Sequence, residues 1–83
     1  MQLIEQVQSI LGETLALGQR ASMLKANTRL LGNFPELDSL AVINVISALE
    51  ERFGIVFDDD EINAEMFETV GTLSTLVSRK LMQ

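Results

Sequence analysis

The stretch from Glu36 to Ile55, ELDSLAVINVISALEERFGI, decides the fold of this 83-residue chain. It opens with Asp38 and Ser39, residue types that are favoured at the start of a helix. The apolar residues that follow at helical spacing form one row, Ile43, Ile46, Leu49 and Phe53, which Val42 and Val45 widen. Gly54 is a residue type that commonly follows the end of a helix. The stretch therefore predicts a helix from about Ser39 to Phe53.

Downstream of this helix, the sequence predicts a connector, a short helix and a final helix. Residues 55–57 are apolar, but nothing nearby could pair with them as a strand. The acidic run 58–61 suits the positive end of a helix dipole and predicts a short helix from Ile62 to Phe67. A final helix is predicted from Val70 to Leu81, with Thr69 as its N-cap. Its expected inner row is Val70, Leu73, Leu76, Val77 and Leu81.

Upstream, the sequence predicts one further helix and a long loop. Apolar residues at helical spacing predict a helix from Gln2 to about Leu17. Gly12 disfavours this helix by about 1 kcal/mol relative to Ala, so an early end is expected. Residues 18–38 mix turn formers with apolar residues, which predicts a loop held against the core. The apolar residues expected to hold it are Met23, Leu24, Leu30, Leu31, Phe34 and Leu37.

The expected architecture is all-α, a small four-helix bundle with three longer helices, one short helix and a long first loop. A chain of 83 residues fits a single domain, expected to span residues 1–83. Hydrophobic residues make up 47% of the chain, which is enough to form a packed core from aliphatic side chains.

Composition argues against several classes of function. The chain has no His and no Cys, so it lacks the commonest general base and the commonest soft metal ligands. We therefore expect no enzyme activity and no metal site. A net charge of -6 disfavours nucleic acid as a partner. The sequence shows no secretory signal and no apolar run of membrane-spanning length. We expect a cytoplasmic protein without membrane insertion, acting as a monomer.

Two interpretations of Ser39 are open from the residues alone. Asp and Ser at a helix start are ordinary capping residues, although the reciprocal capping box is missing because position 42 is Val42. The alternative is that the Ser39 hydroxyl is a point of covalent attachment. The surroundings favour the second interpretation when they are taken together: a long loop before the helix, then an apolar connector, an acidic run and a short helix after it.

The whole arrangement resembles the acyl carrier protein family over nearly the full chain. The triplet Asp38-Ser39-Leu40 is similar to the family's attachment motif, and the stretches 49–55 (LEERFGI) and 58–62 (DDDEI) resemble the end of its second helix and the loop that follows. In that family, a transferase moves 4'-phosphopantetheine from coenzyme A onto the serine. The terminal thiol of the arm then carries acyl groups as thioesters. The resemblance implies that Ser39 is the attachment site, flanked by Asp38 and Leu40.

The resemblance also implies two further sets of residues. The residues expected to contact partner enzymes are Leu40, Ala41, Asn44, Glu50 and Glu51. The residues that are candidates for an acyl pocket are Val42, Ile43, Val45, Ile46 and Leu49, although each of them is equally well explained as ordinary core. General fatty acid carriers have acidic residues where this chain has Ala41 and Asn44, which are expected to be exposed. Arg52 also places a positive charge where family members commonly have an acidic residue.

These departures favour a specialised stand-alone carrier. The implied partners are a phosphopantetheinyl transferase and the acyl-transfer, condensing or ligase enzymes of a fatty acid, polyketide or other lipid pathway. Two alternatives stay open. One is an unmodified helical adaptor that keeps the carrier fold, and the other is a carrier of aminoacyl groups.

Overall fold

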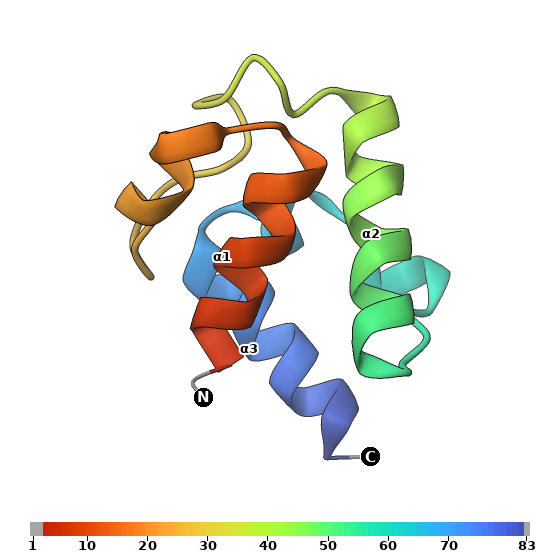
Figure 1. Cartoon of the computed structure of the whole chain (residues 1–83). Coiled ribbons are helices and arrows are strands. Elements are labelled where there is room, and N and C mark those ends of the chain that lie inside the picture. The colour runs from red at the N-terminus through yellow and green to blue at the C-terminus, as the bar shows by residue number, and fades with distance from the viewer. Residues whose placement is uncertain (1–2, 83) are drawn as a thin grey trace.

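The computed structural model describes residues 3–82, which form three α-helices joined by loops that contain short 3₁₀-helices (Figure 1). The α-helices are α1 (Leu3–Thr14), α2 (Ser39–Phe53) and α3 (Val70–Leu81). The 3₁₀-helices are η1 (Gly18–Met23), η2 (Asp59–Glu61) and η3 (Ala64–Phe67). The predicted all-α small bundle, with three longer helices and a long first loop, is confirmed.

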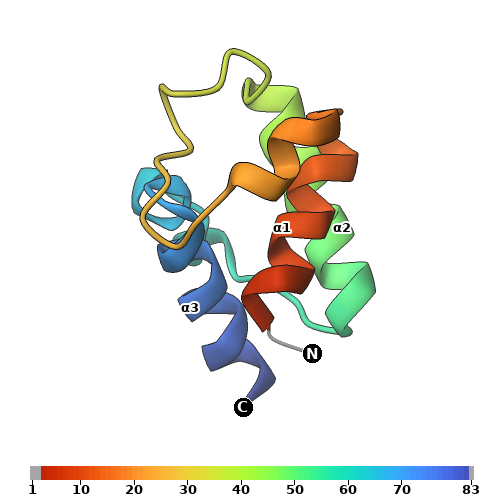
Figure 2. The ribbon, with the colours of Figure 1, turned by 60° about the vertical axis from the view of Figure 1, so that its left-hand side comes forward.

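Helix α1 packs against both α2 and α3, as the two views in Figures 1 and 2 show. Its inner side chains Val7, Ile10 and Leu11 are buried. The side chains of α2 and α3 that join them in the core are Val45, Ile46, Leu49, Val70, Leu73 and Val77. The segment that contains η2 and η3 connects α2 to α3 and contributes the buried side chains of Met66 and Phe67. Its position beside α2 matters for the site described below.

The first helix ends earlier than its apolar pattern extends. The predicted helix began at Gln2, which lies outside the described residues, and continued to about Leu17. The observed helix ends at Thr14, and Ala16 has a positive φ of 53° that no α-helix accommodates. Leu15 and Leu17 are still buried, because the chain turns back over the core after the helix ends. The apolar pattern thus marked burial correctly but overestimated the length of the helix.

Gly12 does not end α1, and the structure gives it a packing role. A Cβ at position 12 would lie 2.6 Å from the Cβ of Ala21 in η1. Real Cβ atoms do not approach each other so closely, so glycine at this position allows η1 to pack directly on α1. The cost of glycine within the helix is therefore compensated by this close contact.

The long first loop contains η1, a 3₁₀-helix that the sequence did not reveal. Leu24, Leu30 and Leu37 hold the loop against the core as predicted, and Phe34 is half-buried. Met23 and Leu31 were expected to do the same, and this prediction is wrong: Met23 is 73% exposed, and Leu31 is also exposed. Residues 26–31 instead attach to the start of α3 through backbone hydrogen bonds. The N–H groups of Val70 and Gly71 donate to the carbonyls of Thr28 and Ala26, at 3.0 and 2.8 Å.

The other predicted boundaries agree well with the structure, with three corrections. Helix α2 spans Ser39–Phe53 as expected, and Gly54 ends it with a φ of 66°. Helix α3 begins after the N-cap Thr69, as expected, but Leu81 is exposed and does not belong to the inner row. Ile43 is 59% exposed and does not belong to the inner row of α2. The predicted short helix at 62–67 is confined to η3, while η2 occupies the acidic run before it.

Candidate functional site

The start of α2 is capped by Asp38 and not by Ser39. The Asp38 side chain accepts a hydrogen bond from the backbone N–H of Ala41, with 2.8 Å between N and Oδ1. The Asp38 carbonyl accepts the first helical hydrogen bond from Val42, at 2.9 Å. Ser39 is the first residue of the helix and is exposed. Among residues 3–82, the Ser39 hydroxyl makes no hydrogen bond to another protein atom, so the capping arrangement leaves that hydroxyl available at the surface.

The helix start also presents unpaired backbone donors beside Ser39. Among residues 3–82, neither the N–H of Ser39 nor that of Leu40 donates to another protein atom. Such donors, together with the helix dipole, favour a bound anion at this end of a helix. A phosphate group on the Ser39 oxygen would therefore lie in a favourable electrostatic environment.

The loop that leads into α2 is held by an ion pair. Arg20 of η1 donates to the carboxylate of Glu36, which lies three residues before Ser39. The hydrogen bond from Arg20 holds the pKa of Glu36 below its ordinary value, assisted by a backbone hydrogen bond. Because this pair connects η1 to the residues that precede α2, it helps to fix the path of the chain into the helix.

An apolar groove of about 280 Å³ lies one turn from Ser39. The residues that line it come from the first loop, α2 and the η2–η3 segment: Leu31, Val42, Ile62, Asn63, Ala64 and Phe67. Val42 links the groove to the site, because it follows Ser39 by three positions on the same helix. The exposure of Leu31 is explained here, because this side chain forms part of the groove wall.

The predicted acyl-pocket residues are therefore distributed over three environments. Val42 lines the groove. Val45, Ile46 and Leu49 are buried in the common core, consistent with their alternative interpretation as ordinary core residues. Ile43 lies on the outer surface of α2. Sequence reasoning missed the groove residues outside α2, because they lie on loops and on η3, where no helical period marks one face.

The predicted docking residues also separate by environment. Leu40, Asn44 and Glu51 are exposed on α2. Ala41 was expected to be exposed, but it is half-buried against the core. Glu50 is half-buried, and its carboxylate accepts a hydrogen bond from the N–H of Phe57 at 2.9 Å. Glu50 therefore has a structural role, because it holds the connector at residues 55–57 against the end of α2.

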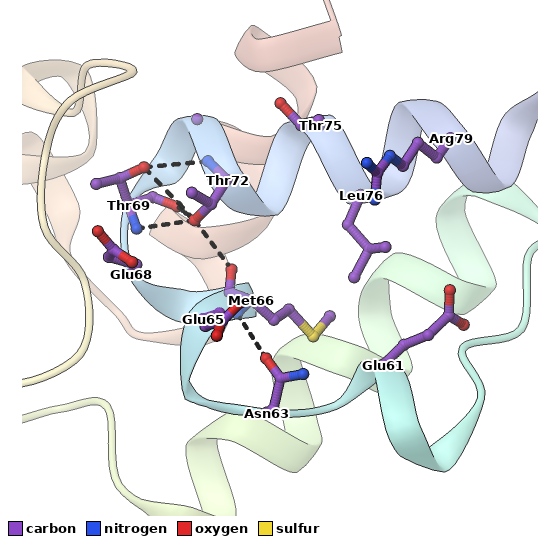
Figure 3. Close-up of a pocket in the computed structure, with 11 residues that line it drawn as sticks. Glu61, Asn63, Glu65, Met66, Glu68, Thr69, Thr72, Thr75, Leu76 and Arg79 are labelled. Atoms are coloured by element: carbon purple, nitrogen blue, oxygen red, sulfur yellow. Dashed lines mark hydrogen bonds between the residues drawn. The ribbon is translucent and has the colours of Figure 1, made fainter.

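A second, larger groove of about 630 Å³ lies on the other side of the η2–η3 segment, along α3 (Figure 3). None of the predicted site residues lines it. Its sides are polar, with Glu65, Thr69 and Thr72 at one end and Glu61 and Arg79 at the other, while Met66 and Leu76 contribute apolar surface (Figure 3).

Among residues 3–82, no group of three or more acidic side chains is arranged to hold a metal ion. In the same part of the chain, no helix is long and apolar enough to cross a membrane.

Comparison with known proteins agrees with this geometry. Residues 2–77 match the family described as "Phosphopantetheine attachment site". The solution NMR structure of a holo acyl carrier protein from Nitrosomonas europaea is 55% identical to this chain, and each chain is covered over 100% of its length with a TM-score of 0.93. No curated protein gives a significant match. The chain belongs to the acyl carrier protein family, whose prosthetic group is 4'-phosphopantetheine.

Proposed function

We propose that the chain acts as one carrier domain and bears 4'-phosphopantetheine on Ser39, presenting acyl groups to the enzymes of a specialised fatty acid, polyketide or other lipid pathway. The observation that carries this proposal is the division of labour at the start of α2. Asp38 caps the helix by accepting from the N–H of Ala41, so the neighbouring hydroxyl of Ser39 stays exposed and unbonded within the described residues. A carrier needs a modifiable hydroxyl of this kind and no catalytic group of its own.

The residues around Ser39 fit a phosphodiester. The unpaired N–H groups of Ser39 and Leu40 point toward the N-terminal end of α2, where negative charge is stabilised. The side chain of Leu40 is exposed and does not cover the Ser39 hydroxyl, so a transferase can approach that hydroxyl. When bound, the group supplies the terminal thiol on which acyl groups are held as thioesters.

The groove beside Val42 is the site that we propose for the acyl chain. Its lining exposes little polar surface, and it begins within one helical turn of the attachment point. An apolar chain bound there would be removed from water, and this removal is the main driving force for its binding. Few polar groups of the protein would lose their contact with water in return. The core residues Val45, Ile46 and Leu49 would then support the groove from behind instead of contacting the chain directly.

The outer face of α2 supports a choice of partners that differs from general fatty acid synthesis. From Ser39 to Leu49 the chain carries no charged residue, although the whole protein has a net charge of -6. Leu40 and Ile43 are exposed on this face, at 66% and 59%. Partner enzymes that bind carboxylates at the start of this helix through basic residues would form few ion pairs with this protein. We propose acyl-transfer, condensing or ligase enzymes whose docking surface is neutral and apolar.

Loading with coenzyme A and a promiscuous phosphopantetheinyl transferase tests the proposed function. The intact mass of the wild-type protein should increase by one phosphopantetheine group. Ser39→Ala should not increase in mass, and Ser47→Ala, a matched change on the exposed side of the same helix, should load as the wild type does. If wild-type protein gains no mass with several transferases, an unmodified adaptor is the better account. If it loads but accepts only aminoacyl groups, the cargo class proposed here is wrong.

A further inference from the structure

The segment from Glu61 to Ala64 forms a wall that is shared by the two grooves. Ile62, Asn63 and Ala64 line the apolar groove beside α2, while Glu61 and Asn63 line the larger groove beside α3. Figure 3 shows this segment passing below α3, with Glu61 at one end and Asn63 at the other. Val42 of α2 and Leu31 of the first loop also line the apolar groove, so a movement of this short wall relative to them would change the width of the groove.

The wall is anchored at its two ends in different ways. At its C-terminal end, Asn63 accepts a hydrogen bond from the N–H of Met66, and the side chains of Met66 and Phe67 are buried in the core. At its N-terminal end, η2 consists of three acidic residues, none of which is buried. The anchor there is Glu61, whose Oε1 lies 2.9 Å from Nζ of Lys80 on α3. The same oxygen accepts a hydrogen bond from the N–H of Asp58 at 2.7 Å.

Lys80 is well placed for an ionic anchor. Its side chain is only 8% exposed, and that of Glu61 is 23% exposed, so the pair is shielded from water more than an ordinary surface pair. Asp58 places a second carboxylate oxygen 3.8 Å from the same ammonium group. The neighbouring cation, Arg79, is exposed and has no ion-pair partner among residues 3–82. Two adjacent cations on α3 therefore differ in whether they form an ion pair with Glu61 of the wall.

We propose that Lys80 is a positioning residue for the acyl groove: by holding Glu61, it fixes the wall at residues 61–64 against α3 and thereby sets how far the groove beside Val42 opens. This inference rests on the proposed function insofar as the groove is taken to receive the acyl chain. The wall and its anchor can be tested in the unmodified protein, without any bound group.

The test compares amide hydrogen exchange in wild-type, Lys80→Met, Lys80→Arg and Arg79→Met proteins. Methionine keeps the length of the lysine stem and removes its charge. The informative amide is that of Ile62, which donates to the carbonyl of Asp59 at 3.2 Å. We expect it to exchange on the order of threefold faster in Lys80→Met. Lys80→Arg should restore slow exchange, and Arg79→Met, which changes the net charge equally, should match the wild type.

A second measurement connects the wall to the cargo. Octanoyl and acetyl groups are loaded onto each phosphopantetheinylated variant, and the rate of thioester hydrolysis is measured. The octanoyl thioester of Lys80→Met should hydrolyse on the order of threefold faster than that of the wild type, while the rate for the acetyl form, which has little apolar surface to bury in the groove, should not change. Arg79→Met should match the wild type for both groups.

Three results would overturn the inference. The first is an unchanged Ile62 exchange rate in Lys80→Met. The second is an equal increase at buried amides of α1 and α2, because that would show a general loss of stability instead of a local effect. The third is a loosened wall with unchanged octanoyl hydrolysis, because the wall would then not control the groove. Failure of the wild type to load would instead contradict the proposed function and would leave the exchange result standing.

Discussion

At the scale of single residues, the division of roles between Asp38 and Ser39 organises the site. Asp and Ser are both good N-caps, so their order alone does not determine which of them caps the helix. The structure assigns the cap to Asp38, whose side chain bonds to the N–H of Ala41. Ser39 is displaced by one position into the first turn, where its hydroxyl has no structural role in the described residues.

This assignment predicts unequal stability effects for two neighbouring substitutions. Asp38→Ala should lower the free energy of unfolding by about 1 kcal/mol, because it removes the acceptor for the Ala41 N–H. Asp38→Asn should retain most of the stability, since its side-chain oxygen can accept the same bond. Ser39→Ala should be close to neutral. Urea denaturation measures all three, and a Ser39→Ala variant that is destabilised more than Asp38→Ala would show that the cap is misassigned.

Residue-scale predictions from the sequence succeeded where a local rule applied. The N-cap Thr69 and the terminating glycine at position 54 are short-range features that the sequence shows directly, whereas Asp38 and Ser39 were both possible caps for α2. The exposed positions of Ile43 and Leu81 were not predicted, because an apolar residue at the edge of a helical stripe can face inward or outward. Which way it faces depends on how the helix is rotated against its neighbours, and that is a tertiary property.

At the scale of elements, the contact between α1 and η1 shows how a glycine can be required inside a helix. Helix propensity favours Ala over Gly by about 1 kcal/mol in the helix interior. A Cβ added at residue 12 would lie 2.6 Å from the Cβ of Ala21, and this steric clash disfavours Ala at position 12. Packing should outweigh propensity here, because overpacking in a tight contact costs about 1 to 3 kcal/mol.

Gly12→Ala should therefore destabilise the protein by about 1 kcal/mol, although it improves helix propensity. Combining it with Ala21→Gly should recover most of the loss, because the second change removes the clashing methyl group. The measurement is a double-mutant cycle by chemical denaturation. If Gly12→Ala alone raises stability, η1 does not pack on α1 as closely as described.

The ion pair between η2 and α3 predicts a specific pH dependence. The hydrogen bond from Lys80 holds the pKa of Glu61 below its ordinary value. A carboxylate with a lowered pKa in the folded state contributes stability above its unfolded pKa, and that contribution is lost as the pH falls through the lowered value. Wild-type protein should therefore have a higher melting temperature than Glu61→Gln near neutral pH. The difference should shrink as the pH falls below the ordinary range for glutamate, and a difference that stays constant down to pH 3 would contradict the assignment.

Element-scale prediction from sequence was good for α2 and α3 and poorer for the loops. Helical periodicity located both helices because each buries one continuous stripe. Neither η1 nor the wall formed by residues 61–64 has such a stripe, since each is too short for apolar residues to recur over several turns. The anchor between Glu61 and Lys80 joins residues that are 19 positions apart in sequence, and no local pattern indicates that they meet.

At the scale of the whole molecule, the distribution of charge matters more for partner choice than its sum. The net charge is -6, but the first eleven residues of α2 carry none of it. Glu50 would contribute less to the proposed docking surface than its sequence position indicates, because its carboxylate accepts a hydrogen bond from the N–H of Phe57. The exposed part of α2 near Ser39 is therefore neutral.

This neutral face predicts weak use of the protein by general fatty acid synthesis enzymes. Exposed charge pairs are worth about 0.2 to 1 kcal/mol each, so two missing pairs would weaken docking by up to about one and a half decades. Because Ala41 is half-buried, the positions suitable for restoring acid are the exposed Asn44 and Ser47. Asn44→Glu with Ser47→Glu should increase malonyl transfer by a general malonyl transferase, mainly through faster association at low salt.

Asn44→Gln with Ser47→Gln is the matched control, because it alters size without adding charge and should leave the transfer rate unchanged. A general fatty acid carrier serves as the reference. Wild-type transfer as fast as that of the reference carrier would contradict the proposal of specialised partners, and the protein would then be an ordinary fatty acid carrier.

We propose that Ser39, left free because Asp38 caps α2, is the single attachment point. The most direct test of this proposal is fragmentation mass spectrometry of the transferase-treated wild-type protein, which locates the added group on a residue. We expect one phosphopantetheine group on the peptide that contains Asp38-Ser39-Leu40, carried by Ser39 and by no other serine or threonine. A group found on Ser47 or on any other hydroxyl, with Ser39 unmodified, would contradict it.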